Sequence, residues 1–309
     1  MIRKALGLIS CALILCVAAR LAEGAEAFRI ATYNLNNYLL HASGSRPAKS
    51  DASKAKIRES VAALKADVLA VQEIGGAEAL AELRTLLGLD GLSYPYWEHI
   101  TAHDTEIQVA VLSRFPIIAR NPHTNDSFLL YGRRFRAGRG FAEVQIQVNS
   151  NYVFSLITTH LKSRLPVPAA DEADLREQEA ILLHEKIDRI LKNNPDANLV
   201  VLGDLNDTKS SVALRTIIGK GSRMLIDARP AERNGDDQWH PHAGYDPPKI
   251  TWTHYYGKED TYSRIDYILL SPGMVKEWNR ADTFIPTLPN WGIGSDHRPI
   301  AATFWAENR

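Results

Sequence analysis

Short apolar runs rich in β-branched residues recur along the chain, and they constrain the fold more than any other feature of the sequence. Each run has the length of one strand, and several are apolar throughout, which is typical of strands covered on both faces. Several runs follow one another with no helical segment between them, which favours two packed sheets over one alternating parallel sheet. The runs are Phe28–Leu35, Asp67–Ile74, Ile107–Ser113, Phe141–Val148, Val153–His160, Asn198–Leu205, Arg264–Leu270 and Pro299–Phe304.

Three segments between these runs show helical spacing. They are Lys54–Lys65, Ala77–Leu87 and Glu172–Lys192. In the longest, Leu183, Ile187 and Leu191 recur at helical intervals and mark one apolar face. Because the sequence shows no repeat and no linker-like shift in composition, it predicts one α/β domain over residues 28–309. The stretches 163–170, 230–248 and 286–294 are expected to be long loops, which often carry function.

The first 27 residues differ from the rest of the chain. Arg3 and Lys4 give a positive start, and small residues precede Phe28. The apolar run between them is about 15 residues long, below the ~20 needed for a membrane-spanning helix. These features predict a secretory signal peptide over residues 1–27, and hence a secreted or periplasmic protein with no membrane insertion after cleavage. The alternative is an uncleaved membrane anchor.

The charge balance bears on which partners the chain can bind. The sequence has 36 basic and 36 acidic residues, and residues 1–27 hold three and two of them, which leaves 33 and 34 and a net charge of −1. A polyanionic substrate would therefore need a local basic patch or a metal. Both cysteines, Cys11 and Cys16, lie in the predicted signal peptide, so disulfide and thiol chemistry are not expected after cleavage. Nothing in the sequence indicates a protein partner, so we expect a monomer.

Polar side chains stand at the ends of the apolar runs. Taken singly, an Asp or Asn there is usually a turn former, and a lone His is usually packed or exposed. Asp266 differs because it lies inside an apolar run, where an unpaired carboxylate costs on the order of several kcal/mol. We therefore expect it to have a His or Arg partner. The other clusters are Thr32-Tyr33-Asn34, Gln72-Glu73, Thr159-His160, Gly203-Asp204-Leu205-Asn206 and Ser295-Asp296-His297.

The side chains in these clusters indicate a hard metal ion. Oxygen ligands are offered by Asn34, Glu73, Asp204, Asn206 and Asp296. Residues 28–309 contain no cysteine, and none of the clusters has a His-x-x-x-His spacing, so zinc or copper chemistry is poorly supported. Oxygen ligands suit Mg²⁺ or Mn²⁺, which keep several waters and also bind substrate phosphate oxygens.

Together, these clusters resemble the endonuclease/exonuclease/phosphatase superfamily. The motifs occur in the order used by that group, which includes deoxyribonuclease I-like nucleases, exonuclease III-like repair enzymes, neutral sphingomyelinases and inositol-polyphosphate 5-phosphatases. The resemblance spans roughly residues 28–306. It implies a four-layer αββα sandwich of two mixed β-sheets flanked by helices, with the active site on one rim. The motif residues are Asn34, Gln72-Glu73, Thr159-His160-Leu161, Gly203-Asp204-Leu205-Asn206, Arg264-Ile265-Asp266-Tyr267 and Ser295-Asp296-His297.

The resemblance implies metal and base roles for some of these residues. Glu73 would be the direct metal ligand, with Asn34 beside it. Asp296 would help to hold the metal or position the loop of His297. His297 would be the general base that takes a proton from water, and Asp266 would orient it. Such a pair suits proton transfer near neutral pH, because the carboxylate fixes the tautomer and favours the imidazolium.

Other residues would act on the scissile phosphate. The resemblance implies that Asp204 polarises the water or leaving group, and that Asn206 and His160 donate hydrogen bonds to phosphate oxygens. Many relatives carry a tyrosine near the run Ile107–Ser113, where this chain has none. We expect Glu106, just before that run, to orient His160 instead.

An arginine-rich segment bears on the substrate. Four arginines and two aromatic residues lie close together in it, a composition that suits a phosphate backbone and base stacking. Arg139, beside a predicted strand, is the strongest candidate for a phosphate contact. The alternative is a solvated loop. The segment contains Tyr131, Arg133, Arg134, Phe135, Arg136 and Arg139.

These expectations favour a secreted Mg²⁺-dependent nuclease acting on DNA or RNA. A sphingomyelinase-like enzyme is the second hypothesis, and it would need an exposed aromatic hairpin. Tyr38-Leu39-Leu40 and Trp291 are the only candidates for such a hairpin in the sequence. An inositol-phosphate phosphatase-like enzyme is the third. A non-catalytic binding protein on the same fold is disfavoured because no catalytic position is replaced.

Overall fold

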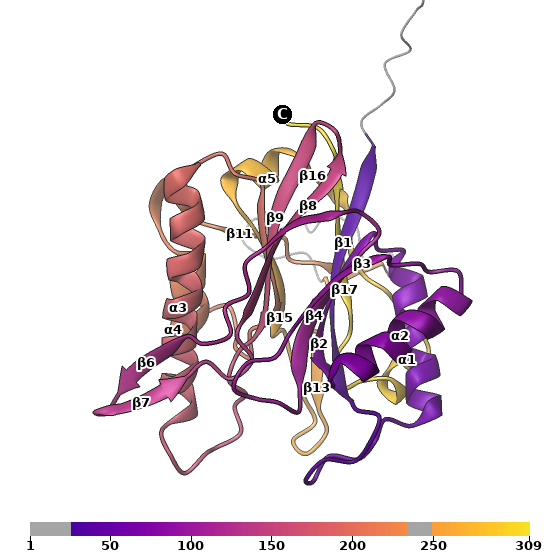
Figure 1. Ribbon diagram of the computed structural model, residues 1–309, viewed down its shortest axis with the longest axis vertical. Helices are drawn as coiled ribbons and strands as arrows, with labels where there is room; N and C mark the ends of the chain where they lie inside the picture. Colours follow the sequence, from indigo (N-terminus) through magenta and orange to yellow (C-terminus); the bar gives the residue numbers. More distant parts are fainter. Residues whose placement is uncertain (1–25, 234–248) are drawn as a thin grey trace, which may run out of the picture.

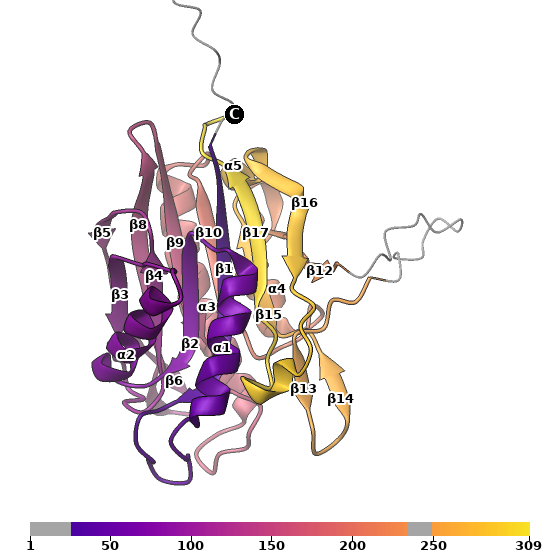
Figure 2. The same cartoon turned by 90° about the vertical axis from the view of Figure 1, so that its right-hand side faces the viewer.

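Two mixed β-sheets pack face to face, and helices cover both outer faces (Figures 1 and 2). The computed structural model describes residues 26–233 and 249–309. In order across the sheet, the first sheet contains β12 (Ala231–Glu232), β16 (Trp278–Ile285), β17 (Ile300–Trp305), β1 (Ala27–Tyr38), β2 (Val68–Ile74), β4 (Gln108–Ser113) and β3 (Tyr96–Ile100). The second contains β11 (Ile226–Asp227), β15 (Asp266–Leu270), β10 (Leu199–Asp204), β9 (Tyr152–His160), β8 (Phe141–Asn149) and β5 (Ile117–Arg120).

The helices form the two outer layers (Figure 2). Helices α1 and α2 pack on the first sheet, where Ile57 joins a buried cluster with Leu69. Helices α3 and α4 pack on the second sheet, where Leu183 joins a cluster with Val201. The predicted four-layer αββα sandwich is therefore confirmed. The helices are α1 (Asp51–Leu64), α2 (Ala77–Leu89), α3 (Glu172–Asn193), α4 (Val212–Ile218) and α5 (Pro272–Lys276), with short 3₁₀ turns η1 (Gly221–Arg223) and η2 (Trp291–Ile293).

Two short hairpins stand apart from the two sheets. One joins β6 (Ser127–Leu130) to β7 (Arg133–Arg136) and projects sideways past the lower half of α3 (Figure 1). The other joins β13 (His254–Tyr256) to β14 (Thr261–Ser263) and projects below β15 and β17 (Figure 2). In the two described ranges, none of the helices is long and apolar enough to cross a membrane.

Aromatic side chains fill the space between the two sheets. The ring of Phe28 lies 5.3 Å from that of Phe154 on the facing sheet and 5.7 Å from that of Phe304 on its own. All three side chains are buried. Each such ring contributes about 1.5–3 kcal/mol when it is fully buried. The inner core therefore provides a rigid base beneath the rim that carries the motif residues.

All the predicted apolar runs form strands, and the three predicted helices are present within a few residues of their expected ends. Of the strands that the sequence did not predict, β3 and β5 lie at sheet edges and are partly exposed, so they lack an apolar run. The predicted loop 286–294 contains η2, and most of the predicted loop 230–248 lies outside the described residues. Residues 1–25 of the predicted signal peptide also lie outside the described residues, and β1 begins at Ala27.

Strand direction brings the motif residues to one rim. β1 runs parallel to β2, and β9 runs parallel to β10, so the carboxyl ends of each pair lie at the same edge. Asp204, the last residue of β10, is in register with His160 on one side and with Asp266 on the other. Gly203 makes this register possible, because its φ is +136° and a Cβ there would lie 2.1 Å from the carbonyl oxygen of Thr159.

A polar clamp at the opposite end joins the first sheet to α1. Arg29 of β1 donates to the carboxylate of Asp282 on β16 at 2.5 Å and to the carbonyl oxygen of Leu64 in α1 at 2.9 Å. Thr303 of β17 donates to the same carboxylate at 2.7 Å, and Arg233 pairs with it as well. Burial raises the pKa of Asp282, but the hydrogen bonds from Thr303 and Arg29 outweigh burial and lower it.

This clamp predicts a pH-dependent stability. A carboxyl with a lowered pKa in the folded state stabilises the fold above its ordinary pKa and loses that contribution as pH falls below it. Asp282→Asn should therefore cost about 1 kcal/mol in the free energy of unfolding at pH 7. The difference from wild type should shrink as pH falls below about 4. Urea unfolding at several pH values measures it.

Asp196→Asn is the matched control, because that side chain is 78% exposed and pairs with Lys276 at the surface. It should change stability by less than about 0.5 kcal/mol at any pH. A pH-independent loss in Asp282→Asn would mean that packing, not charge, maintains the clamp.

Candidate active site

A buried histidine and a buried aspartate meet across the two sheets. Asp266 begins β15 in the second sheet, and His297 lies in the turn before β17 in the first. Nδ1 of His297 is 2.8 Å from Oδ2 of Asp266. Arg264 forms an ion pair with Asp227 instead of Asp266. The partner expected for the Asp266 carboxylate is therefore the histidine.

Hydrogen bonds fix the backbone on both sides of this pair. Ser295 Oγ donates to the carbonyl oxygen of Asn34 at 2.8 Å and accepts from the backbone N–H of His297 at 3.0 Å. Thr253 Oγ1 accepts from the backbone N–H of Asp266 at 3.1 Å. Because both backbones are tied down, the imidazole keeps its second nitrogen, Nε2, facing the rim.

Asp204 faces that second nitrogen. Its Oδ2 lies 3.6 Å from His297 Nε2 and accepts from Asn34 Nδ2 at 2.9 Å. Burial raises the pKa of Asp204 well above that of an ordinary carboxyl. Burial alone would lower the pKa of His297, but the carboxylates of Asp266 and Asp204 outweigh it and raise that pKa to about 10. The three residues form a chain that can hold a proton between two carboxylates.

Glu73 reaches the rim from a β-bulge. Its φ is 57°, in the left-handed region that non-glycine residues seldom adopt, and the pairing of β2 with β4 shifts register at this point. Its carboxylate accepts from the backbone N–H of Asn37 at 2.9 Å and from Asn34 Nδ2 at 3.2 Å. Strain of this kind clusters at functional sites. Here it accompanies the turn of the Glu73 side chain toward Asn34.

His160 closes the inner wall of the site. Its Nε2 lies 3.5 Å from Asp204 Oδ2 and 3.8 Å from Glu73 Oε1. Burial, together with the charge of Arg139, lowers the pKa of His160 well below its ordinary value, so the ring is neutral. Its Nδ1 is buried without a hydrogen-bond partner among the described residues. The expectation that Glu106 orients His160 is wrong, because Glu106 instead pairs with Arg46 and accepts from Ser43.

Asn206 supports Asp204 from the next turn. Its φ is 53°, and its backbone N–H donates to Asp204 Oδ1 at 2.9 Å. Its side-chain Nδ2 donates to the carbonyl oxygen of Leu161 at 3.0 Å. In this structure one N–H of the Asn206 amide therefore anchors the loop after β10, next to the site.

The arginines of the expected phosphate-binding segment separate into two groups. The side chain of Arg139 is 10% exposed, lies 3.3 Å from Asp104 Oδ2 and is close enough to the site to influence His160. The other three, Arg133, Arg134 and Arg136, are exposed on β7 in the hairpin that projects past the lower half of α3. Only this second group presents its guanidinium groups to solvent.

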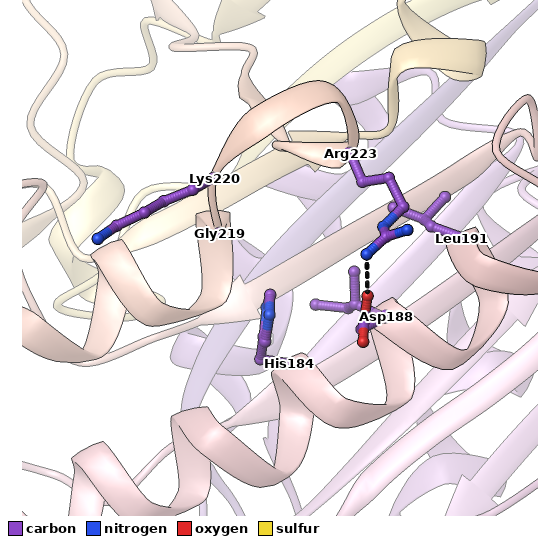
Figure 3. A pocket seen from close by; sticks show the side chains of 7 residues that line it. His184, Asp188, Leu191, Gly219, Lys220 and Arg223 are labelled. Carbon is purple, nitrogen blue, oxygen red and sulfur yellow. Dashed lines mark ion pairs between the residues drawn. The ribbon is translucent and has the colours of Figure 1, made fainter.

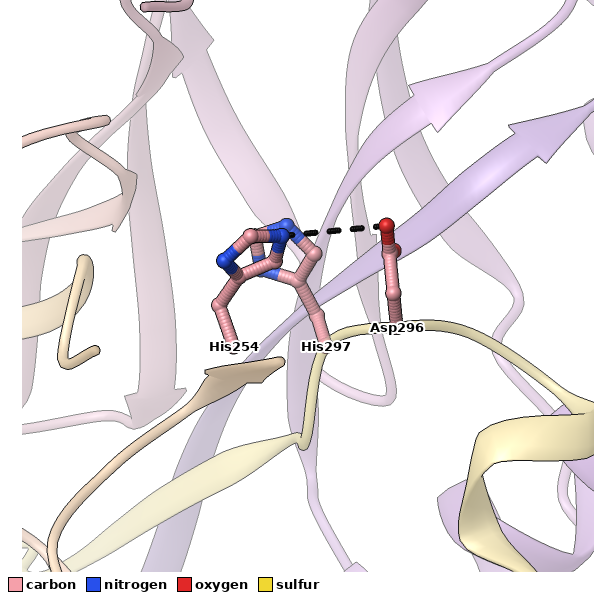
Figure 4. A group of neighbouring side chains, drawn as sticks. All are labelled: His254, Asp296 and His297. Atoms are coloured by element: carbon pink, nitrogen blue, oxygen red, sulfur yellow. Dashed lines mark ion pairs between the residues drawn. The ribbon is translucent and has the colours of Figure 1, made fainter. Parts of the chain in front are cut away.

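Two residues near the rim were not expected from the sequence. His254 Nε2 lies 3.7 Å from Asp296 Oδ2, and its ring centroid lies 4.6 Å from that of His297 (Figure 4). Lys49 donates to the carbonyl oxygen of Asn36 at 2.6 Å. Burial lowers the pKa of Lys49 to about 8, although the nearby carboxylates of Asp296 and Glu73 oppose this shift. Neither residue had a sequence signal, because one precedes α1 and the other begins a three-residue strand.

A separate hollow between α3 and the turn that follows α4 takes no part in this arrangement (Figure 3). It encloses about 70 Å³ and is lined by His184, Asp188 and Arg223, among others. Asp188 and Arg223 form an ion pair of 3.1 Å across it. Because both helices lie on the outer face of the second sheet, this hollow is remote from the rim.

The sequence profile of the endonuclease/exonuclease/phosphatase family matches residues 31–297, which is most of the chain. The chain belongs to this family. It is therefore a metal-dependent phosphoesterase, a hydrolase of phosphate esters. A search of curated proteins found no significant match.

Solved structures share the fold of this family member at low sequence identity. The catalytic domain of human Nocturnin with bound sulfate is 17% identical, with a TM-score of 0.61 over 90% of this chain and 94% of that one. Sphingomyelinase C from Streptomyces griseocarneus is 19% identical, with a TM-score of 0.59 over 90% and 99%. A 3′ phosphatase from Neisseria bound to a product DNA hairpin is 17% identical, with a TM-score of 0.56 over 90% and 99%.

The rim of this family member fits a divalent metal. The side chains of Glu73 and Asp296 are 17% and 44% exposed, and neither carboxylate pairs with a lysine or arginine within the described ranges. Their oxygens suit Mg²⁺ or Mn²⁺. Asn34 presents its Nδ2 to the carboxylates here, so its oxygen would face a metal only after the amide rotates. Donor atoms of Asp204, Asp266 and His297 also lie within 4.8 Å of one another.

The geometry predicts that His297 and Asp266 act as one unit. His297→Ala should lower kcat by about 10²–10⁴-fold. Asp266→Asn should lose much of the same factor, and the double variant should lose little more, because groups that act together are not additive. The measurement is kcat for each variant on one phosphodiester substrate, with circular dichroism to show that the fold is intact.

His184→Ala is the matched control, because that histidine lines the hollow between α3 and the turn that follows α4. It should leave kcat unchanged. Near-normal turnover in folded His297→Ala, or additive losses in the double variant, would show that the pair does not transfer the proton.

Proposed function

We propose that the chain is a secreted, magnesium-dependent nuclease that hydrolyses phosphodiester bonds in DNA or RNA. The observation that carries this proposal is the chain Asp266–His297–Asp204, with contacts of 2.8 and 3.6 Å, beside the partly exposed carboxylate of Glu73. This arrangement combines a proton acceptor and a site for a hard metal at one rim. Both are needed to drive water against an anionic phosphodiester.

In the proposed reaction the Asp204–His297 pair takes a proton from the attacking water. Asp266 holds the imidazole through Nδ1, which leaves Nε2 facing Asp204. Because burial raises the pKa of Asp204, a proton can reside on either member of the pair. His160, neutral and buried, can donate from Nε2 to a phosphate oxygen. A metal held by Glu73 and Asp296 would neutralise phosphate charge and stabilise the leaving oxygen.

The exposed arginines of β7 support a polyanionic substrate. The β6–β7 hairpin lies toward the same end of the sandwich as the carboxyl ends of β1 and β2 (Figure 1), and Arg139 follows it in the chain. Arg133, Arg134 and Arg136 could then neutralise phosphates farther along a strand. A small phosphate monoester would not reach them. The proposed secretion rests on residues 1–27 alone, whose composition is that of a signal peptide.

A lipid phosphodiesterase is the second candidate. The sequence offered no convincing aromatic hairpin for it, but the β13–β14 hairpin, whose His254 forms a β-bridge with His297, carries the exposed Tyr262. A substrate panel decides between the candidates. Purified protein would be assayed on plasmid, linear DNA, RNA, sphingomyelin and inositol phosphates, each with and without Mg²⁺. We expect cleavage of nucleic acid, and hydrolysis of sphingomyelin with DNA and RNA untouched would refute the nuclease proposal.

Metal dependence is a prediction of this mechanism. Chelator should abolish activity, and Mg²⁺ or Mn²⁺ should restore it. Glu73→Gln should raise the metal concentration needed for half-maximal activity and lower turnover, because a neutral amide binds a hard cation less well than a carboxylate. Metal titration of activity measures both effects.

Glu98→Gln is the control for that titration. Glu98 lies on the edge strand β3, where its carboxylate pairs with Arg120 and takes no part in the site. It should titrate like wild type. Full activity in excess chelator would rule out the mechanism, and a normal metal titration in Glu73→Gln would remove Glu73 from the ligand set.

The arginine hairpin makes a second prediction, on salt. Replacing Arg133, Arg134 and Arg136 with Ala should raise KM for nucleic acid more than it lowers kcat. The dependence of log KM on log salt concentration should flatten by about 0.7–0.9 for each phosphate that the variant no longer neutralises. Steady-state kinetics at several salt concentrations measure the slope.

Arg114, Arg223 and Arg309 provide the matched triple control, because each is more than 40% exposed and none lies on the β6–β7 hairpin. Their replacement with Ala should leave the slope unchanged. If both triple variants shift KM equally, the hairpin is a solvated loop and binds no phosphate.

A further inference from the structure

Aromatic rings gather on and around the β13–β14 hairpin. The ring of Tyr262 lies 4.8 Å from that of Tyr255 across the hairpin and 4.7 Å from that of Trp252. Trp291 of η2 lies 5.4 Å from Trp252. These four residues form what we call the aromatic platform. Tyr262 is 59% exposed, so the platform presents an aromatic surface to solvent.

The platform is joined directly to the catalytic residues. The backbone N–H of Tyr255 donates to the carbonyl oxygen of Asp296 at 3.0 Å, and that of Arg298 donates to the carbonyl oxygen of Thr253 at 2.6 Å. His254, between Thr253 and Tyr255, forms a β-bridge with His297. The hairpin that carries the platform is therefore fixed against the turn that holds Asp296 and His297.

Packing within the hairpin does not account for this arrangement. Tyr262 is 59% exposed, so its packing against Tyr255 and Trp252 leaves much of the residue open to solvent. The Arg298 guanidinium lies 4.1 Å from the ring centroid of Trp252 and forms an ion pair with Glu232. These two contacts of Arg298 support Trp252 on one face of its ring. The platform is thus rigid on its inner side and open on its outer side.

We infer that the aromatic platform stacks the bases of a single-stranded nucleic acid whose scissile phosphate lies at His297. This inference rests on the proposed nuclease function and adds to it a preference for substrates with unpaired bases. Every nucleobase has a π-face, so stacking on Tyr262 and its neighbours would tolerate any sequence. Paired bases in a duplex are already stacked and would not offer their faces to the platform.

The hairpin is poorly suited to insertion into a lipid bilayer. Its tip consists of Gly257, Lys258, Glu259 and Asp260, all exposed. Burying those charges in hydrocarbon would be costly. Tyr255 further ties its hydroxyl to the Asp260 carboxylate at 2.6 Å, so the tip stays polar. The aromatic faces lie on the flanks of the hairpin, where a strand passing the rim could reach them.

Variants of Tyr262 test the inference. Tyr262→Ala and Tyr262→Leu remove the π-face, the second while keeping apolar volume, and Tyr262→Phe retains it. Binding is measured by fluorescence anisotropy in chelator, with labelled single-stranded DNA and RNA oligonucleotides and with matched oligonucleotides built of abasic sites. Tyr96→Ala is the control, because Tyr96 is an exposed tyrosine away from the catalytic rim. It is in register with Ser113, and Ser113 is in register with Val68, the first residue of β2, whereas Glu73 lies near the other end of that strand.

We expect Tyr262→Ala and Tyr262→Leu to raise Kd for the base-bearing oligonucleotide by about 5- to 100-fold. Tyr262→Phe and Tyr96→Ala should bind it like wild type, and no variant should change Kd for the abasic oligonucleotide. Equal losses on both oligonucleotides, or no loss on either, would overturn the inference. Thermal unfolding of each variant shows that the hairpin change leaves the fold intact.

Two further outcomes separate this inference from the nuclease proposal. If the oligonucleotide results hold but wild type cleaves no nucleic acid, the proposed function fails and the platform stands as a base-binding surface. Sedimentation with sphingomyelin and phosphatidylcholine vesicles tests the lipid alternative. Vesicle binding that is lost in Tyr262→Ala and kept in Tyr262→Leu, with oligonucleotide binding unchanged, would make the platform a membrane contact and refute base stacking.

Discussion

The buried carboxylate of Asp266 is the constraint on which the rest of the catalytic rim depends. A carboxylate removed from water needs a cation or several donors, and Asp266 finds His297 at 2.8 Å. Because the two residues come from different sheets, their contact sets how the sheets align at this edge. The same alignment brings Asp204 to 3.6 Å from the other ring nitrogen. The need of the Asp266 carboxylate for a partner thus accounts for the position of His297, and with it for the contact between His297 and Asp204.

Backbone strain completes the rim. Asn36, Asn37, Glu73 and Asn206 all have left-handed φ values, between 48° and 57°, although none is glycine. Such conformations cost about 1–3 kcal/mol each and persist only where the surroundings impose them. Here the hydrogen bonds to Asn34 and Asp204 do so. The buried aromatic core between the sheets offsets the free energy that these strained conformations cost.

The two projecting hairpins show how far sequence reasoning reached. The exposed arginines of β7 could be predicted from the sequence, because residues that are neighbours in a short segment are also neighbours in the folded chain. The aromatic platform was not, because Trp252 and Trp291 are far apart in the chain and meet only when η2 packs beside β13. Lys49 and His254 were missed for the same reason. Glu106 was misplaced because Arg46, 60 residues earlier in the chain, captures its carboxylate.

Apolar periodicity in the sequence predicted eight of the strands, three of the helices and a two-sheet α/β arrangement. The four layers and the roles of the catalytic residues came from the resemblance of the motifs to a known family. The contact between Asp204 and His297, the bulge that turns Glu73 inward and the packing of Trp291 against Trp252 needed the folded chain. The first of these joins residues from the two sheets, and no local pattern in the sequence records how closely two sheets approach.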